Sequence, residues 1–102
     1  MFIVLYRWRI KPELEQQFIA AWSEITALIR ENFDSLGSRL HRGNDGLFYG
    51  YAQWKSAEQR ENYVKVFPDF PGREKMREAV EESFPEVILE IASDYLIYPE
   101  KT

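Results

Sequence analysis

The sequence predicts an α+β fold in which helices cover one face of a four-stranded antiparallel sheet, and three observations support it. The assignable elements follow the order strand, helix, strand, strand, helix, strand. The 102 residues are close to the usual size of one domain, and 45% of them are hydrophobic, which is enough for one core. No repeat, low-complexity tract or linker-like segment interrupts the chain. We therefore expect a single ferredoxin-like βαββαβ domain over residues 1–102.

The first strand is predicted over Phe2–Ile10, where β-branched and aromatic residues are frequent. Because side chains alternate along a strand, Tyr6 and Trp8 share one face, while Ile3 and Leu5 share the other. A strand that begins apolar on both faces needs cover on both sides. We assign the face of Tyr6 and Trp8 to the helices.

A long amphipathic helix follows Pro12, a residue suited to the first helical turn, and is expected to end near Asn32. Its apolar positions recur at spacings of three and four: Leu14, Phe18, Ala21, Trp22, Ile25, Leu28 and Ile29. A hairpin comes next, with strands over Ser38–Arg42 and Leu47–Trp54. The turn Gly43-Asn44-Asp45-Gly46 between them supplies residues that tolerate positive φ.

The C-terminal part is predicted to contain helical segments and one long strand. Ser56 and Gln59 form a capping-box pattern, so a helix begins there and ends before Pro68. A further helical stretch is expected over 73–83. The last strand is expected over Val87–Tyr98, and Pro99 ends it.

Composition and charge exclude several classes of function. The net charge is −4, with no run of like charge, so we expect no nucleic-acid partner. The absence of cysteine excludes disulfides, thiolate metal centres and cysteine nucleophiles, and it favours a cytoplasmic location. Arg7 and Arg9 interrupt the opening apolar run too early for a signal peptide or membrane span. Neither a metal cluster nor a phosphate-binding loop is apparent, so no metal site is expected.

The sheet face without helices predicts a homodimer. Ile3, Leu5 and either Ile88 or Leu89 place apolar side chains there, and a second sheet is the simplest cover. Two copies packed by these faces form a two-fold interface, the commonest homo-oligomer arrangement. The alternative is a monomer whose open face is solvated by charged side chains: Arg7, Arg9, Glu90 and Asp94.

Several short motifs along the chain form a recognisable pattern. The first half contains Tyr6-Arg7-Trp8-Arg9, Lys11-Pro12-Glu13, Phe18 and Ala21-Trp22. The second half contains Gly37-Ser38-Arg39-Leu40-His41-Arg42, Asn44-Asp45-Gly46 and Tyr51-Ala52-Gln53-Trp54-Lys55-Ser56. With these motifs, essentially the whole chain resembles the antibiotic biosynthesis monooxygenase (ABM) domain family. The resemblance implies a dimeric α/β barrel, and either cofactor-free oxygenation of aromatic polyketides or quinols or degradation of haem.

The haem-degrading branch can be tested residue by residue. Its members place an Asn on the first strand, a Trp in the helix after the hairpin and an iron-ligating His on a helix. Aligned by the motifs, this chain has Tyr6 and Tyr63 at the first two positions, and no histidine occurs after His41. The resemblance therefore argues against haem degradation, and we expect no cofactor.

Two residues of the second strand are candidates for polar catalysis. Oxygenation without metal or flavin needs a substrate that itself gives an electron to dioxygen, so the protein has to deprotonate and orient it. His41 titrates near neutral pH when unperturbed, and Arg39, two residues away on the same strand face, could stabilise an anionic substrate. Alternatively, His41 is structural and Arg39 pairs with acidic groups across the sheet or the dimer interface.

Aromatic residues on the helix-covered face predict a cavity for a planar ligand. Tyr6 and Tyr63 are its candidate polar, catalytic contacts, and four further side chains are the candidate substrate-binding residues: Trp8, Phe18, Trp22 and Phe67. The alternative is a filled aromatic core. The sequence thus predicts a cofactor-independent, monooxygenase-like protein acting on a small aromatic or quinol-like substrate. The competing class is a non-enzymatic dimeric barrel that binds a small hydrophobic molecule or a partner protein.

Overall fold

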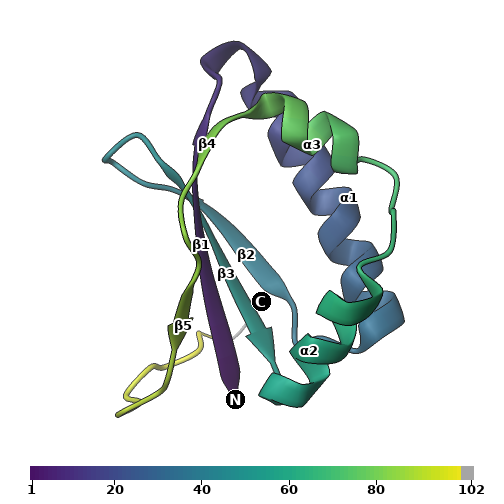
Figure 1. Cartoon of the computed structure of the whole chain (residues 1–102). Coiled ribbons are helices and arrows are strands. Elements are labelled where there is room, and N and C mark those ends of the chain that lie inside the picture. The colour runs from purple at the N-terminus through teal and green to yellow at the C-terminus, as the bar shows by residue number, and fades with distance from the viewer. Residues whose placement is uncertain (100–102) are drawn as a thin grey trace.

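The computed structural model describes residues 1–99 and has one antiparallel sheet with its helices on one face (Figure 1). Its elements are β1 (Phe2–Ile10), the short 3-10 helix η1 (Pro12–Leu14), α1 (Glu15–Phe33), β2 (Ser38–Arg42), β3 (Phe48–Trp54), α2 (Ala57–Val66), α3 (Arg73–Ala79), β4 (Val80–Ser83) and β5 (Val87–Leu89). The strands lie in the order β2-β3-β1-β4, and β5 also pairs with β1. The expected ferredoxin-like α+β fold is confirmed.

The fourth strand position is occupied by two short strands, which corrects two expected boundaries. The helix expected over 73–83 ends at Ala79, because the chain then pairs with the end of β1, with Val80 opposite Ile10. The strand expected over Val87–Tyr98 ends at Leu89. Pro85 lies between β4 and β5 and has no N–H to donate, so it interrupts the pairing of this part of the chain with β1.

The expected alternation along β1 is confirmed by the core. Trp8 belongs to one buried cluster under the helices and Val4 to a second. Phe18 of α1 is fully buried between Trp8 and Phe48, with ring centroids 5.3 and 5.5 Å away in edge-to-face geometry. This filled aromatic group anchors α1 on the sheet.

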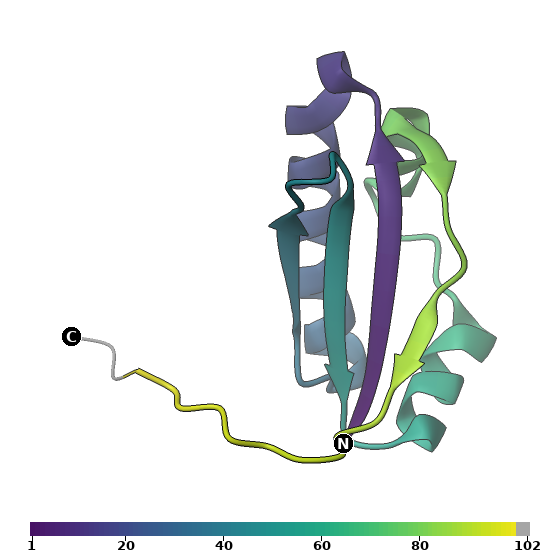
Figure 2. The same cartoon turned by 90° about the vertical axis from the view of Figure 1, so that its left-hand side faces the viewer.

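The opposite face of the sheet carries no helix within residues 1–99, as the view in Figure 2 shows. Cross-strand register places Arg7, Tyr49 and His41 side by side on it, and Leu5, Tyr51 and Arg39 form the next row. In the same described range, no helix combines the length and apolar character needed to cross a membrane. Residues 90–99 follow β5 without further helix or strand.

Candidate functional site

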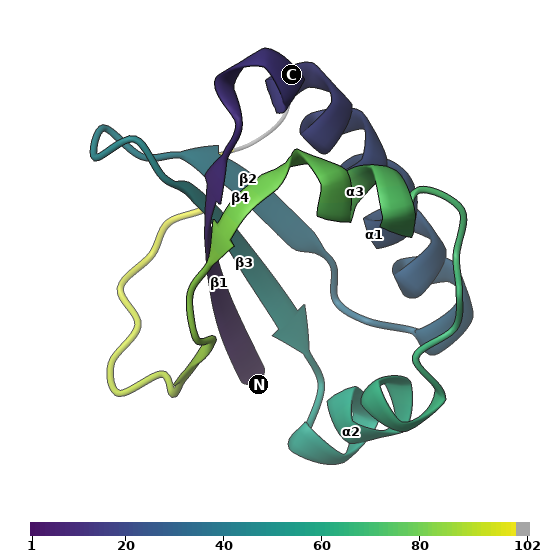
Figure 3. The same cartoon turned by 45° about the horizontal axis from the view of Figure 1, so that its top comes forward.

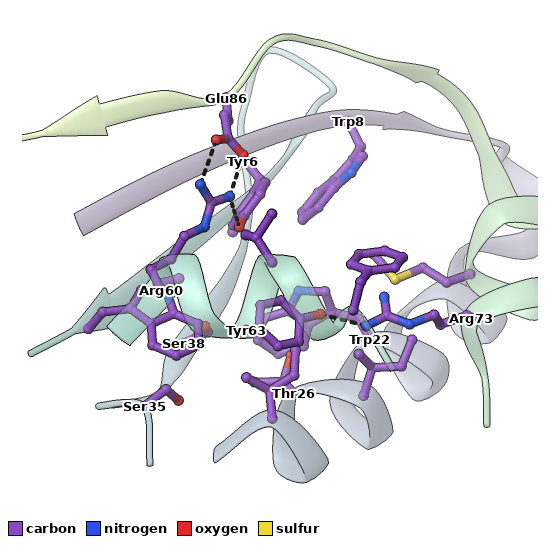
Figure 4. Close-up of a pocket in the computed structure, with 18 residues that line it drawn as sticks. Tyr6, Trp8, Trp22, Thr26, Ser35, Ser38, Arg60, Tyr63, Arg73 and Glu86 are labelled. Carbon is purple, nitrogen blue, oxygen red and sulfur yellow. Dashed lines mark hydrogen bonds and ion pairs between the residues drawn. The ribbon is translucent and has the colours of Figure 1, made fainter. Parts of the chain in front are cut away.

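A cavity of about 370 Å³ lies between the sheet and the helices (Figure 4). Residues of three strands, all three α-helices and the segments between elements form its wall: Tyr6, Trp8, Trp22, Ile25, Thr26, Ile29, Ser35, Ser38, Gly50, Ala52, Trp54, Arg60, Tyr63, Val64, Phe67, Arg73, Met76 and Glu86. Its size and largely apolar wall are those of a small-molecule site.

The floor of the cavity depends on a small residue in β3. A Cβ atom added to Gly50 would lie 2.9 Å from Cη2 of Trp8, so glycine allows the indole ring to lie close to the strand. Tyr6 stacks on Trp8 with ring centroids 5.7 Å apart and ring planes at 7°. The two rings form a flat aromatic surface that suits a planar ligand.

At one end of the cavity, Arg60 joins Tyr6 to Glu86. Its Nη2 donates to the Tyr6 hydroxyl at 3.2 Å, and the two Nη atoms donate to the Glu86 carboxylate at 2.9 and 2.7 Å. Burial raises the pKa of Tyr6 above its ordinary value of 10.0, although Arg60 acts in the opposite direction. Tyr6 is therefore a neutral phenol whose oxygen accepts from Arg60, and its own proton is available for a ligand.

At the other end, Arg73 holds Tyr63. Arg73 Nη2 donates to the Tyr63 hydroxyl at 2.5 Å, and its Nε donates to the Pro68 carbonyl at 2.8 Å. The guanidinium also lies 4.1 Å from the ring centroid of Phe67. The described residues form no ion pair with Arg73, whereas Arg60 is paired with Glu86. Arg73 is thus the cation of the cavity whose charge is not balanced.

The turn between α2 and α3 positions Phe67 and Arg73 beside Tyr63. Phe67 ends α2 with φ at 37°, in the left-handed region that is costly for a bulky residue, and its N–H donates to the Tyr63 carbonyl at 2.7 Å. Gly72 then takes a φ of 96°, which glycine tolerates, and α3 begins at Arg73. This turn brings Phe67 and Arg73 back to Tyr63.

The structure divides the residues selected from the sequence between the two faces of the sheet. Tyr6, Tyr63, Trp8, Trp22 and Phe67 line the cavity. Phe18 does not; it is fully buried in the core beside it.

Arg39 and His41 lie on the open face, exposed, and line a separate hollow with Tyr51. The structure does not bring them together with Tyr6 and Tyr63, and their catalytic role stays a prediction. His41 is the only histidine of the sequence, so the cavity offers no imidazole to a haem iron. Within residues 1–99, no three His, Cys, Asp or Glu side chains gather as metal ligands.

Sequence reasoning missed the three charged residues of the described cavity wall: Arg60, Arg73 and Glu86. Arg60 precedes Tyr63 by three residues in α2, and this helical spacing could have placed the two on one side of the helix. Arg73 and Glu86 follow proline-containing turns, and their positions depend on the tertiary fold.

Together, the fold and the cavity define a ferredoxin-like α+β protein with an aromatic site that presents two arginine-held phenol groups. The chain belongs to the family described as antibiotic biosynthesis monooxygenase, whose sequence model matches residues 1–82. No curated protein matched the chain.

Solved structures resemble the chain over nearly its whole length. An antibiotic biosynthesis monooxygenase has a TM-score of 0.71 at 14% identity, over 91% of this chain and all (100%) of its own. Rv0793 of Mycobacterium tuberculosis has a TM-score of 0.69 at 14% identity, over 93% and 98%. A mutant of SnoaB, a cofactor-independent oxygenase of Streptomyces nogalater, has a TM-score of 0.75 at 11% identity, over 92% and 95%. At such identities the similarity shows the fold alone.

Proposed function

We propose that this protein is a cofactor-independent monooxygenase that acts on a small aromatic, quinol-like substrate in the cavity under the helices. The observation that carries the proposal is the pair of tyrosine hydroxyls, each accepting a hydrogen bond from an arginine, in an aromatic wall. Membership of the ABM family supports the same reaction class. The cysteine-free sequence suits the reducing cytoplasm, where we expect the protein to act.

The two Tyr–Arg groups can stabilise the form of the substrate that reacts with dioxygen. A phenolate or enolate gives up an electron far more readily than its neutral parent. Hydrogen-bond donors and cations near its oxygen favour this anion. The Tyr6 and Tyr63 hydroxyls can each donate to a substrate oxygen, because each accepts the arginine bond on a lone pair and keeps its own proton for donation. Stabilising the anion in this way lowers the pKa of the bound substrate.

An anthrone-type substrate illustrates the balance of the reaction. The anion of the activated methylene carbon transfers an electron to dioxygen, and the two radicals combine as a peroxide. Collapse of the peroxide leaves one oxygen atom on carbon as a carbonyl. The other oxygen atom departs as water with the two methylene hydrogens. The substrate supplies all the electrons, and the protein binds and orients it.

One observation favours the second class, a binding protein without turnover. Glu86 is the only carboxylate in the cavity wall described, and both of its oxygens accept from Arg60. The cavity therefore holds no free carboxylate base. A substrate that does not ionise readily would bind there without reacting.

Oxygen uptake separates the two classes. We expect uptake with anthrones or hydroquinones, loss of most of the rate in Tyr63→Phe and Arg73→Met, and little change in the open-face variant His41→Gln. Binding of the same compounds without uptake would support the binding protein. A rate that depends on His41 and not on Tyr63 would move the site to the open face.

A further inference from the structure

We propose that the cavity continues into an anion-binding subsite at α3, and that its ligand is a planar aromatic compound with a carboxylate on a short side chain. Arg73 and Arg77 of α3 hold this carboxylate. The inference deepens the proposed function, on which the identification of the ligand as a substrate rests. The binding itself can be measured without turnover.

A hollow of about 260 Å³ between α3 and β4, called the α3 hollow below, adjoins the cavity. Four side chains line both spaces: Trp8, Phe67, Arg73 and Met76. Figure 3 shows α3 continuing directly into β4, which brings residues of both elements to this edge of the sheet. A ligand whose ring lies in the cavity can therefore extend a side chain into the α3 hollow.

Arg73 is fixed where the two spaces meet, and it keeps donors for a ligand. Its Nε donates to the Pro68 carbonyl and its Nη2 to the Tyr63 hydroxyl, whereas its Nη1 donates to no described group. The guanidinium also lies 4.1 and 5.7 Å from the ring centroids of Phe67 and Phe70. Because these contacts already order the side chain, little rotamer freedom is lost when it binds an anion.

Arg77 adds a second cation to the α3 hollow, one helical turn after Arg73. Side chains four residues apart lie on the same side of a helix, and like charges at this spacing disfavour each other slightly. Among the described residues, no carboxylate pairs with either arginine, and none lines the α3 hollow. An anion between the two arginines removes this repulsion and gains charge-assisted hydrogen bonds.

Three carboxylates close to these arginines in the sequence contact other groups. Glu78 accepts from Gln17 of α1 at 3.2 Å. Glu81 and Glu82 lie 4.0 and 3.6 Å from Nε of Arg9 in β1. The change from helix to strand after α3 brings the last two beside β1, and the α3 hollow keeps its positive charge.

A carboxylate matches the donors that remain. Two of the three nitrogen atoms of Arg73 already donate to the protein. The remaining donors are its Nη1, the guanidinium of Arg77 and the hydroxyl of Ser83, which also lines the α3 hollow. This short set suits the two oxygen atoms of a carboxylate better than the three of a phosphate dianion.

Isothermal titration calorimetry with a matched pair of probes tests the subsite. The probes are naphthylpropanoate and its primary amide, which has the same shape without the charge. The protein should bind the acid about tenfold more tightly than the amide, since hydrogen bonds to a charged group are the stronger ones. Equal affinity would overturn the proposal, as would failure of both probes to bind. Tighter binding of the corresponding phosphonate would contradict the assignment to a carboxylate.

Three variants locate the preference for the acid. Arg77→Met should remove most of it without changing the affinity for the amide, and Arg77→Lys, which keeps the charge, should retain it. The matched control is Arg30→Met, which removes an exposed arginine of α1 outside both spaces and should leave the preference intact. An undiminished preference in Arg77→Met, or an equal loss in Arg30→Met, would refute the subsite.

Oxygen uptake keeps this inference separate from the proposed function. If the preference for the acid depends on Arg77 but no hydroquinone with such a side chain supports uptake, then the subsite stands and the monooxygenase is wrong. If neutral hydroquinones and those with the carboxylate react with equal kcat/KM, then the monooxygenase stands and the α3 hollow does not select the substrate.

Discussion

On the helix-covered face of the sheet, Tyr6 and Tyr63 are enclosed, and each hydroxyl accepts a hydrogen bond from an arginine. On the open face, Tyr49 donates its hydroxyl proton to Asp45, and this pair is exposed to solvent. Both faces therefore carry tyrosines, arginines and carboxylates. They differ in whether helices cover them.

Whether helices cover a sheet face decides what its polar side chains can do. In a partly dry cavity, an ion or hydrogen bond is screened little, so an arginine without a carboxylate attracts a ligand anion strongly. On an exposed strand, water satisfies the same groups and the attraction is small. The helix face thus suits binding and chemistry. The open face suits association with another surface.

The largest effect is expected where the helix face is fully packed. Phe18→Ala should lower the free energy of unfolding by about 3–5 kcal/mol, because it removes a fully buried ring between Trp8 and Phe48. Phe67→Ala is the matched control, since that ring is 55% exposed at the cavity. It should change stability by less than about 1 kcal/mol while weakening binding of a planar aromatic probe. Urea denaturation measures the stability of both variants, and probe fluorescence measures their binding of the aromatic probe. Equal losses of stability would mean that the cavity is packed as tightly as the core.

A second comparison concerns the arginines of the two faces. Arg73→Met should weaken binding of an aromatic carboxylate or phenolate by about 10–100-fold, since a hydrogen bond to a charged group contributes roughly 1.5–3 kcal/mol. Arg39→Met, on the open face, should leave the affinity unchanged. Isothermal titration calorimetry of both variants, with a neutral aromatic of similar shape as reference, checks this. An equal loss for the neutral compound would assign Arg73 a packing role only.

The same division shows what the sequence could reveal. The two-residue period correctly placed Tyr6 and Trp8 on one face of β1 and Ile3 and Leu5 on the other, because strand geometry fixes alternation locally. The predicted end of α3 was wrong because Val80 fits both a helical period and a strand. Pairing with Ile10, at the far end of the sequence, decides between them.

The candidate site was predicted only in part. Tyr6 and Tyr63 could be selected because a phenol on an apolar face needs a polar partner. Their arginine partners could not be selected from the sequence, since Arg73 resembles any charged residue on the solvated side of a helix. Its position depends on the positive φ values at Phe67 and Gly72, which no local pattern required.

The smallest expected effect is a difference between the tyrosines of the two faces in how they make folding stability depend on pH. Burial raises the pKa of Tyr6 above 10.0 in the folded protein, so the fold favours the neutral phenol. Below pH 10 both folded and unfolded chains keep this proton, and the stabilising effect is fully present. As the pH rises through 10 toward the folded pKa, the unfolded chain loses the proton first, and stability falls.

Tyr6→Phe should therefore reduce the loss of stability between about pH 9 and 11, at a cost near neutral pH of about 1 kcal/mol for the lost hydrogen bond. Tyr49→Phe is the matched control. The hydrogen bond to Asp45 raises the pKa of Tyr49 as well, but this hydrogen bond lies at the exposed surface and solvent screens its coupling to folding. Urea denaturation of both variants across this pH range tests the difference. If the two variants alter the alkaline slope equally, then Tyr6 is as hydrated as Tyr49, and the cavity is too wet for its arginines to bind an anion strongly.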